Sequence, residues 1–416
     1  MKLLDVTVHG QLVGTLSHGH HENYRFEPEV AWREGNGIPV MSFQLYQQRP
    51  KAWVSAHLPV WFENLLPERD SELRNLLCKR LGLRDGQSMA LLQVLGGDLP
   101  GAVEVRGDAG VLDSPEDSPP DSPQTDALRF SSLAGVQLKF SMAKSGTKYT
   151  LPAHGGHTEW IVKIPGVDMP LLPAIEHATM AWARAMNLPV PETQVVETSD
   201  LVGLESFLRR GIDHAFAIQR YDRLEGGKRV HQEDFAQVLN FEPRHKYGKQ
   251  EGKRASMDTI AQIVQQACHH EVLEELMRRF AFVVASGNDD AHLKNWSFVY
   301  GEDSAVPTLA PVYDQVCTIA VNSQAFGWDL EKGPTLGLRL GKEDRFRALG
   351  VVHLDRLMER LVDGGALKQR FLEAIENARD TWSTVAHLAP LEMHEALERH
   401  WREVPLLNHV GGWRGA

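Results

Sequence analysis

The sequence is poor in cysteine and has no long apolar run. Its 416 residues include three cysteines, Cys78, Cys268 and Cys317, and no two of them form a C-x-x-C pair. This excludes a disulfide framework and a zinc ribbon, and it fits a reducing compartment. No window reaches the roughly 18 consecutive apolar residues of a membrane span. The first ten residues contain Asp5 and lack the apolar stretch of a signal peptide. We therefore expect a cytoplasmic protein.

An excess of positive charge is also missing. The chain has 44 Lys and Arg against 55 Asp and Glu, which gives a net charge of −11. Six of the acids lie in residues 107–127, a segment without Lys or Arg, which leaves −5 for the rest of the chain. This balance argues against binding of nucleic acid over the whole surface, although it allows a local basic patch.

What is present is typical of a globular protein with two or three domains. The chain has 42% hydrophobic and 24% charged residues. Its clearest boundary is the acidic, Pro- and Ser-rich segment 107–127, in which almost no side chain can pack into a core. We predict a small mixed α/β subdomain over 1–106, this linker over 107–127, a strand-rich region over 128–222 and a mainly helical half over 223–416.

Apolar periodicity predicts where strands and helices lie. Alternation predicts a hairpin within 3–16, a second hairpin within 137–151, and strands at 159–164, 192–196, 204–208, 215–221, 296–300 and 308–313. Helical spacing predicts helices at 67–81, 171–187, 256–268, 271–286, 353–362, 366–383 and 390–402.

The residues that can carry chemistry follow the apolar helix at 271–286. Asp290 and Asn295 stand in the D-x-x-x-x-N spacing of a kinase catalytic loop, in which the Asp accepts the proton of the attacking hydroxyl and the Asn binds Mg²⁺. Asp314 follows a strand pair, at the place of the second metal-binding carboxylate. Lys294 can neutralise the transferring phosphate. Taken alone, this cluster could equally be a helix-ending turn with solvated acids.

A second pair of residues upstream favours a nucleotide site. Lys163 lies within a predicted strand, and Glu176 lies 13 residues later on the helix among the strands. Kinases use a strand Lys paired with a helix Glu to hold the α- and β-phosphates. Each residue alone is more often solvated than functional. The segment 217–223 then ends the last strand before the helical half, where a kinase hinge would meet the adenine.

These residues resemble the HipA family, the serine/threonine kinase toxins of bacterial type II toxin–antitoxin modules. In the N-terminal half, the family's A-G-x-Q-x-K loop matches residues 134–139, and its strand lysine before proline matches Lys163 to Pro165. Its R-F/Y-D-R hinge matches residues 220–223, and its Q-E-D motif matches residues 232–234. Its N-x-D-A-H-x-K-N loop matches residues 288–295, and its Y-D pair matches Tyr313 and Asp314. Residues 62–67 also resemble the family's N-terminal subdomain. The sequence departs from the family at Asp289, where Thr is frequent, and at Gln219, where Glu is common.

The resemblance implies an α+β, two-lobed protein-kinase-like fold. Its β-rich N-terminal lobe would carry an extra N-terminal subdomain, and its C-terminal lobe would be all-helical. It also implies ATP and Mg²⁺ as cofactors, Asp290 and Lys294 as catalytic residues, and Asn295 and Asp314 as metal ligands. The implied nucleotide-binding residues are Ala134, Gly135, Val136, Gln137, Lys139, Lys163, Glu176, Gln219, Tyr221, Asp222, Gln232 and His292, and the implied self-phosphorylation site is Ser132, with Ser131 as second choice.

The resemblance further implies two protein partners. One is a small helix-turn-helix antitoxin similar to HipB, which would supply most of the contacts to DNA because this chain is mildly acidic. The other is a protein substrate, expected to be a translation component such as an aminoacyl-tRNA synthetase, with growth arrest as the consequence.

Two other functional classes stay open from the residues alone. Asp289, Asp290, His292 and Asp314 could form the two-metal cluster of a nuclease, or the chain could be a catalytically silent partner of an antitoxin and DNA. Neither class needs Lys163 paired with Glu176. The presence of both residues therefore favours the kinase.

Two histidine-rich segments and one basic segment can also be considered as candidate sites. The histidines at 18–21 and the segment 268–271 lack the paired-ligand spacing of a zinc site. The basic segment 244–254 has five Lys or Arg and one acid. It is either a solvated loop or a contact for substrate or nucleic acid.

Overall fold

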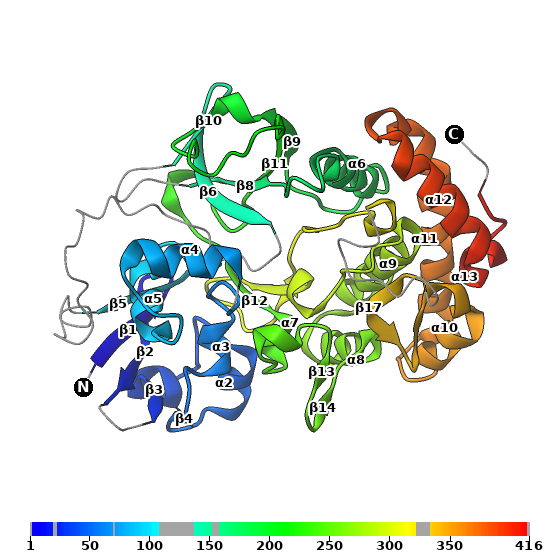
Figure 1. The fold of residues 1–416 in the computed structure, drawn as a ribbon. Coiled ribbons are helices and arrows are strands. Elements are labelled where there is room, and N and C mark those ends of the chain that lie inside the picture. Colours follow the sequence, from blue (N-terminus) through cyan, green and yellow to red (C-terminus); the bar gives the residue numbers. More distant parts are fainter. Residues whose placement is uncertain are drawn as a thin grey trace.

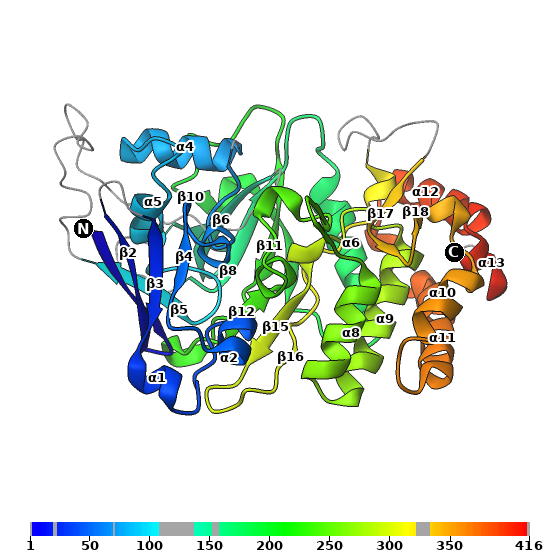
Figure 2. The same ribbon diagram turned by 90° about the horizontal axis from the view of Figure 1, so that it is seen from below.

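The computed structural model describes residues 2–19, 23–69, 71–107, 137–151, 158–321 and 333–413. Two lobes follow one another, and a subdomain built from the first part of the chain packs beside both. The two ends of the chain lie at opposite ends of the molecule in both views (Figures 1 and 2).

The N-terminal subdomain is a five-stranded antiparallel sheet in the order β4-β3-β2-β1-β5, with short helices beside it. The expected first hairpin is confirmed: His9 and Gly10 form its turn with positive φ at both residues, as a type I′ turn requires. The helix expected from residue 67 begins only at Glu72, after its cap Ser71. The elements are β1 (Lys2–Val8), β2 (Gln11–His18), β3 (Tyr24–Pro28), α1 (Val30–Glu34), α2 (Phe43–Gln48), β4 (Trp53–Ser55), α3 (Val60–Glu63), α4 (Glu72–Leu81), α5 (Ser88–Leu95) and β5 (Val103–Gly107).

The N-terminal lobe is a six-stranded sheet in the order β10-β7-β6-β8-β11-β9, with one helix, α6, beside it (Figure 1). The second hairpin, the strand near 160 and the helix near 175 are confirmed. The strand expected at 204–208 is wrong: Leu204 and Phe207 pack into the core from turns that follow Gly203. The elements are β6 (Leu138–Ser145), β7 (Lys148–Thr150), β8 (Trp160–Ile164), α6 (Leu172–Ala185), β9 (Thr193–Glu197), β10 (Leu201–Val202) and β11 (His214–Gln219).

A small central sheet joins the subdomain to the C-terminal lobe (Figure 2). Its strand order is β12-β15-β16. The two strands expected after the catalytic loop are present, but the second, expected over 308–313, ends at Leu309. Strand β12 was not expected, because its sequence, His-Gln-Glu-Asp, is polar throughout. The elements are β12 (His231–Asp234), α7 (Phe235–Val238), β15 (Ser297–Tyr300) and β16 (Thr308–Leu309).

The C-terminal lobe is mainly helical, and its five expected helices are confirmed. The expectation that it is all-helical is wrong, because two further hairpins lie in it. Strand β17 escaped detection because residues 336–338 are buried on both faces and include Gly337, so apolar and polar residues do not alternate. The elements are β13 (Lys249–Gln250), β14 (Lys253–Arg254), α8 (Met257–Ala267), α9 (His270–Ser286), β17 (Thr335–Leu340), β18 (Glu343–Arg345), α10 (Val351–Met358), α11 (Gly364–Val385), α12 (Leu391–Glu403) and α13 (Pro405–His409).

Two apolar cores hold these parts together. One is shared by the subdomain and the N-terminal sheet and includes Phe62 and Phe140. The other runs from α6 into the C-terminal helices, where the Trp182 ring lies 4.9 Å from that of Trp382. Trp182 also donates to the carbonyl of Ala378 at 2.8 Å. Helix α6 is therefore anchored on the C-terminal lobe although it covers the N-terminal sheet. The α+β, two-lobed fold is thus confirmed.

A search for membrane-spanning helices gave a negative result. In the described ranges, no helix combines the length and the apolar content that crossing a bilayer requires.

Candidate active site

Two narrow cavities lie between the lobes, and the first of them also borders the subdomain. They measure about 80 and 90 Å³, which is below the usual size of a ligand pocket, so the cleft is closed. The first is lined by Asn64, Leu65, Pro100, Ile161, Lys163, Ile218, Gln219, Arg220, Tyr221, Asp222, Gln232, Asp234, Gln237, Lys294, Asn295, Ser297, Tyr313 and Asp314. The second is lined by Gln137, Lys139, Lys163, Met169, Leu172, Glu176, Lys246, Tyr247, Asp290, His292, Asn295, Asp314, Val316 and Thr318.

Two lysines and two carboxylates close the cleft. Lys139 on β6 and Lys163 on β8 are direct cross-strand partners, so their side chains leave the same face of the sheet. Lys163 forms ion pairs with Glu176 of α6 and with Asp314 of the C-terminal lobe. Lys139 Nζ lies 2.9 Å from the other oxygen of Asp314. Two buried positive charges that would repel each other are therefore neutralised by one carboxylate from each lobe.

The electrostatics of this group follow from burial and pairing. Burial opposes the charged form of Lys163, but Asp314 and Glu176 overcome it and hold the lysine's pKa above its usual value. Burial alone would raise the pKa of Asp314, yet Lys139 and Lys163 hold it far below its ordinary range. Asp314 also adopts a left-handed backbone, with φ of 52°. Strained backbone of this kind clusters at active sites, although in this chain it also occurs in turns such as that at His9.

The catalytic loop starts where α9 ends. Gly287 ends the helix with φ of 64°, and a Cβ there would lie 2.4 Å from Ile319. Asn288 then accepts a hydrogen bond from the backbone N–H of Asp290 at 3.0 Å. Asn295 donates from Nδ2 to the Asp290 carbonyl at 2.8 Å, which fixes the distance between the two residues. The loop is therefore shaped by its own polar side chains.

Asp290 projects into the second cavity, where it meets Tyr247. The Tyr247 hydroxyl donates to Asp290 Oδ1 at 2.6 Å. Burial raises the pKa of the Asp290 carboxyl, and the hydrogen bond from Tyr247 opposes this. A carboxyl with a raised pKa is a better proton acceptor, which suits a general base.

Lys294 and His292 lie close to Asp290 in the sequence; His292 Nε2 lies 3.9 Å from Asp290 Oδ1, whereas Lys294 faces other groups. Lys294 Nζ lies 2.6 Å from Asp234 Oδ2 and 3.0 Å from Asn64 Oδ1. This ammonium therefore ties the catalytic loop to β12 and to the subdomain. Burial holds the pKa of His292 well below its usual value, so its ring is neutral.

The hinge residues line the first cavity. Tyr221 donates a hydrogen bond to the side chain of Gln232. Its ring centroid lies 5.7 Å from that of Tyr313 in the C-terminal lobe. Gln219, Ile161 and Ile218 complete a mixed wall that can hold a flat aromatic base.

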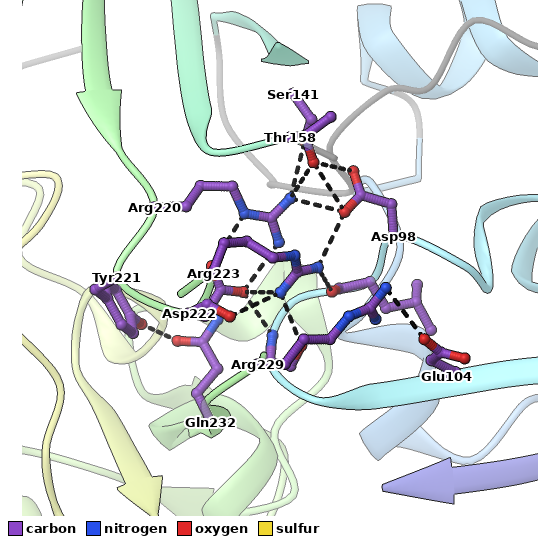
Figure 3. Close-up of polar contacts among 12 residues, drawn as sticks. Asp98, Glu104, Ser141, Thr158, Arg220, Tyr221, Asp222, Arg223, Arg229 and Gln232 are labelled. Atoms are coloured by element: carbon purple, nitrogen blue, oxygen red, sulfur yellow. Dashed lines mark hydrogen bonds and ion pairs between the residues drawn. The ribbon is translucent and has the colours of Figure 1, made fainter. Parts of the chain in front are cut away.

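Asp222 also borders this cavity, but its carboxylate is fully engaged behind the hinge. Figure 3 shows it in a buried cluster with Arg220, Arg223 and Asp98 of the subdomain. The distances across these four ion pairs are 2.9 to 3.0 Å. Asp222 further accepts the backbone N–H of Gly101 at 2.8 Å. Two arginines and two aspartates form a neutral group that fixes the hinge to the subdomain.

Several expected residues lie outside the described ranges. They are Ser131, Ser132, Ala134, Gly135, Val136, His20, His21 and most of the linker, residues 108–127. Of the expected phosphate-covering loop, Gln137 and Lys139 are described, and both line the second cavity.

The donor set of the cleft suits Mg²⁺ bound together with phosphates. Asp314 and Asn295 both line the two cavities and supply hard oxygen atoms. Magnesium typically takes one or two such protein ligands and completes its shell with phosphate oxygens and water. Within the described ranges, no group of three or more His, Cys, Asp or Glu side chains is arranged to hold a metal by itself. The Asp289, Asp290, His292 and Asp314 cluster of the nuclease alternative therefore finds no support.

The sequence did not point to four contributors from other parts of the chain. Asn64, Leu65 and Pro100 of the subdomain line the first cavity, and Tyr247 covers Asp290. The signals for them were slight. Asn64 and Leu65 lie in the segment 62–67 that resembled the family, and Tyr247 lies in the basic segment 244–254.

Both parts of the chain match family models. Residues 4–106 match the model of the HipA N-terminal domain, and residues 131–386 match that of the HipA-like C-terminal domain. Together these matches include the subdomain, the N-terminal lobe, the whole catalytic loop and the C-terminal lobe as far as residue 386, before α12.

Individual relatives and a solved structure agree with these matches. A candidate kinase of Sinorhizobium fredii, Y4dM, is 34% identical over 97% of each chain. The serine/threonine-protein kinase toxin HipA of Shewanella oneidensis is 25% identical over 63% of each chain. A crystal structure of HipA from that organism, in complex with HipB and its operator DNA, is 19% identical and has a TM-score of 0.72, covering 98% of this chain and 99% of that one. At this identity the solved structure supports the fold alone.

Proposed function

This chain belongs to the HipA family, and we propose that it is an ATP-dependent serine/threonine protein kinase that acts in the cytoplasm as the toxin of a type II toxin–antitoxin module. The observation that carries the proposal is the convergence of Lys163, Glu176 and Asp314 from three elements beside Asp290. A phosphotransferase needs this combination of cations and oxygen donors around the transferred group. A protein that only binds a partner has no need of this combination.

The proposal assigns the adenine to the first cavity and the phosphates to the second. The hinge residues Gln219 and Tyr221 would face the base, and Gln232 would hold Tyr221 in place. When phosphates enter, Lys139 and Lys163 can exchange part of their contact with Asp314 for contact with phosphate oxygens. Since the cavities are narrow, the lobes must separate for entry, and breaking these ion pairs is the local event that permits it.

The same exchange frees the donors that would hold Mg²⁺. Asp314 and Asn295 would bind the ion, which neutralises charge that develops on the phosphates. Asp290 then accepts the proton of a substrate serine or threonine hydroxyl as that oxygen attacks the γ-phosphate and ADP leaves. Lys294 contributes by fixing the catalytic loop through Asp234 and Asn64, and neutral His292 lies beside the base, with Nε2 3.9 Å from Asp290 Oδ1.

Nucleotide titration of two variants tests this assignment. Asp290→Ala removes only a group that acts on the acceptor hydroxyl, so its affinity for Mg·ATP should stay within about twofold of the wild type. Asp314→Ala should bind Mg·ATP at least about tenfold more weakly, and the loss should vanish when EDTA replaces Mg²⁺. If the wild type and both variants bind ATP equally well, with or without Mg²⁺, the proposed metal site is wrong.

The proposed substrate is a translation component, such as an aminoacyl-tRNA synthetase, and its phosphorylation would arrest growth. This rests on the family alone, since no residue of the cleft encodes a substrate's identity. Comparing the phosphoproteomes of cells that express the wild type or Asp290→Ala would identify the substrate. If no synthetase peptide differs, this choice is wrong.

The proposed partner is a helix-turn-helix antitoxin similar to HipB, bound to operator DNA. Support comes from the charge balance of this chain and from the assembly of the Shewanella protein with HipB and DNA. The antitoxin would supply most phosphate contacts. Gel shifts with each protein alone test this division, and tight, sequence-specific DNA binding by this chain alone would overturn it.

A further inference from the structure

A hollow of about 630 Å³ lies in the C-terminal lobe, apart from the two cavities of the cleft. It opens between the start of α8, the turn between β17 and β18, and α10. Five cationic residues line it, namely Arg254, Arg339, Lys342, Arg356 and Arg360, together with one acid, Asp258. The volume falls in the range of pockets that take a ligand.

Most of this positive charge is not neutralised within the described part of the chain. Asp258 lies 3.5 Å from Arg360 and also accepts the backbone N–H of Gly341 at 2.6 Å. The other four cations make no ion pair with a described carboxylate. The nearest acid along β18, Glu343, is already paired with Arg345 at 3.0 Å. An excess of four positive charges therefore faces one hollow on a chain whose net charge is −11.

Two connections place this hollow beside the catalytic loop. Strand β17 carries both Arg339, which lines the hollow, and Gly337, two residues earlier. Gly337 touches the catalytic loop so closely that a Cβ at this position would lie 2.9 Å from the backbone of Ala291. On the other side, Ala255 of the hollow donates to the carbonyl of Gly248 at 2.9 Å. Gly248 follows Tyr247, which covers Asp290. The hollow therefore lies beside the part of the cleft where a substrate hydroxyl would meet Asp290.

We propose that this hollow binds an acidic segment of the protein substrate, adjacent to the phosphorylated residue. The proposal rests on the proposed kinase function, because only an acceptor polypeptide needs to reach Asp290. Arginine side chains recognise carboxylates through paired N–H donors, and four arginines line the hollow. An extended chain that presents a hydroxyl to Asp290 would pass the hollow within a few residues. Duplex DNA has no such reason to approach the catalytic loop.

The test uses the full chain and does not depend on nucleotide. A short fluorescein-labelled Glu-Gly repeat peptide is titrated with the protein, and its anisotropy is compared with that of a matched Gln-Gly peptide. The variant Arg339→Glu with Arg356→Glu reverses two charges of the hollow. The control Arg210→Glu with Lys228→Glu makes the same charge change at exposed residues that do not line the hollow. Arg339→Gln with Arg356→Gln replaces the first variant if charge reversal prevents folding.

The hollow predicts that the Glu-Gly peptide binds and the Gln-Gly peptide does not. Binding should weaken roughly tenfold or more in the Arg339 and Arg356 variant and stay within about twofold in the control. Equal binding of both peptides, or equal loss in both variants, would overturn the proposal. Displacement of the peptide by duplex DNA that binds more tightly through Arg339 and Arg356 would also overturn it and assign the hollow to nucleic acid. Absence of phosphotransfer by the wild type would instead contradict the proposed function and leave the peptide result unaffected.

Discussion

The hydroxyl of Tyr247 lies 2.6 Å from Oδ1 of Asp290 and donates a hydrogen bond to it. The carboxylate that would accept the proton of a substrate hydroxyl therefore already holds a hydroxyl of its own chain. Lys246, the preceding residue, is paired with Glu68 of the subdomain at 3.0 Å, and its carbonyl accepts the N–H of Leu293 in the catalytic loop. The segment that covers the base is thus fastened on two sides. A substrate must displace the phenol before it can react.

Replacing Tyr247 by Phe should increase phosphotransfer. The substitution keeps the ring and removes the hydrogen bond, so the acceptor hydroxyl no longer competes with it. Since a hydrogen bond to a charged group contributes about 1.5–3 kcal/mol, we expect a rate roughly tenfold to a hundredfold higher at low substrate concentration. Initial rates with a protein substrate measure this effect, and the affinity for Mg·ATP should not change.

The matched control is Tyr24→Phe, which removes a hydroxyl in the subdomain far along the chain from the catalytic loop. It should leave the rate unchanged. A lower rate in Tyr247→Phe would show that the phenol orients Asp290 for catalysis, and the account of Tyr247 as a cover would then be wrong.

Asp98 should be critical for both stability and nucleotide binding. Asp98→Asn leaves Arg220 and Arg223 with one carboxylate between them in a buried site. Breaking a buried ion pair costs about 3 kcal/mol, which denaturant unfolding should detect. Because the arginines flank Tyr221 and Asp222 of the hinge, the affinity for ATP should also fall, with little change in kcat once ATP is saturating.

Glu104→Gln provides the control for Asp98. Glu104 pairs with Arg229 at 3.1 Å at the edge of the cluster in Figure 3, where both side chains are partly exposed. Loss of the Glu104 carboxylate should lower the free energy of unfolding by less than about 1 kcal/mol and leave the affinity for ATP unchanged. If the two variants lose ATP affinity equally, the hinge is not positioned by Asp98.

Glu233 should make stability depend on pH. This carboxyl is buried between the subdomain and the central sheet, where Trp61 Nε1 and the Phe43 N–H each donate to it at 2.8 Å. Burial raises its pKa from 4.5 to about 7. Between these pH values the folded chain keeps a proton that the unfolded chain has lost, so this residue's contribution to stability falls as pH rises from 4.5 to 7 and is constant above.

Glu233→Gln removes the titration, so the comparison isolates it. The free energy of unfolding of the wild type relative to the variant should fall by about 3 kcal/mol between pH 4.5 and pH 7.5. The exposed Glu398→Gln variant should show no such trend. A difference that is independent of pH, or that rises with pH, would mean that Glu233 is ionised throughout.

Ser132 should become phosphorylated when the protein is incubated with Mg·ATP. The expectation rests on the family and on the sequence around it, because Ser132 lies outside the described residues. The resemblance implies that this loop covers the ATP phosphates, so a phosphate there, which adds nearly two negative charges, should weaken nucleotide binding. Mass spectrometry of the peptide that contains Ser131 and Ser132 measures it. An unmodified peptide from active enzyme, with Asp290→Ala as the inactive control, would refute the prediction.

The sequence predicted best what depends on local pattern. Hairpins and long helices such as α9 follow from periodicity, and Asp290, Asn295 and Asp314 follow from spacing along one stretch of chain. The contact between Lys163 and Glu176 was also expected, because kinases pair a strand Lys with a Glu on the helix that follows. These are relations within short distances along the chain.

Contacts between remote segments left no pattern to detect. Asp98 meets Arg220 across 122 residues, and Tyr247 meets Asp290 across 43. Each is a single polar side chain that is unremarkable until folding buries it. Strand β12 was missed for a related reason: Glu233 is buried because the subdomain supplies its hydrogen-bond donors, and composition alone makes it appear solvated.

The most direct test of the central claim is transfer of the γ-phosphate of radiolabelled ATP to protein serine or threonine. The wild type with Mg²⁺ should label itself or a protein from a lysate, and acid hydrolysis should release phosphoserine or phosphothreonine. Asp290→Ala, which still binds Mg·ATP, should transfer less than about one-hundredth as much. Equal labelling by wild type and Asp290→Ala would contradict the account.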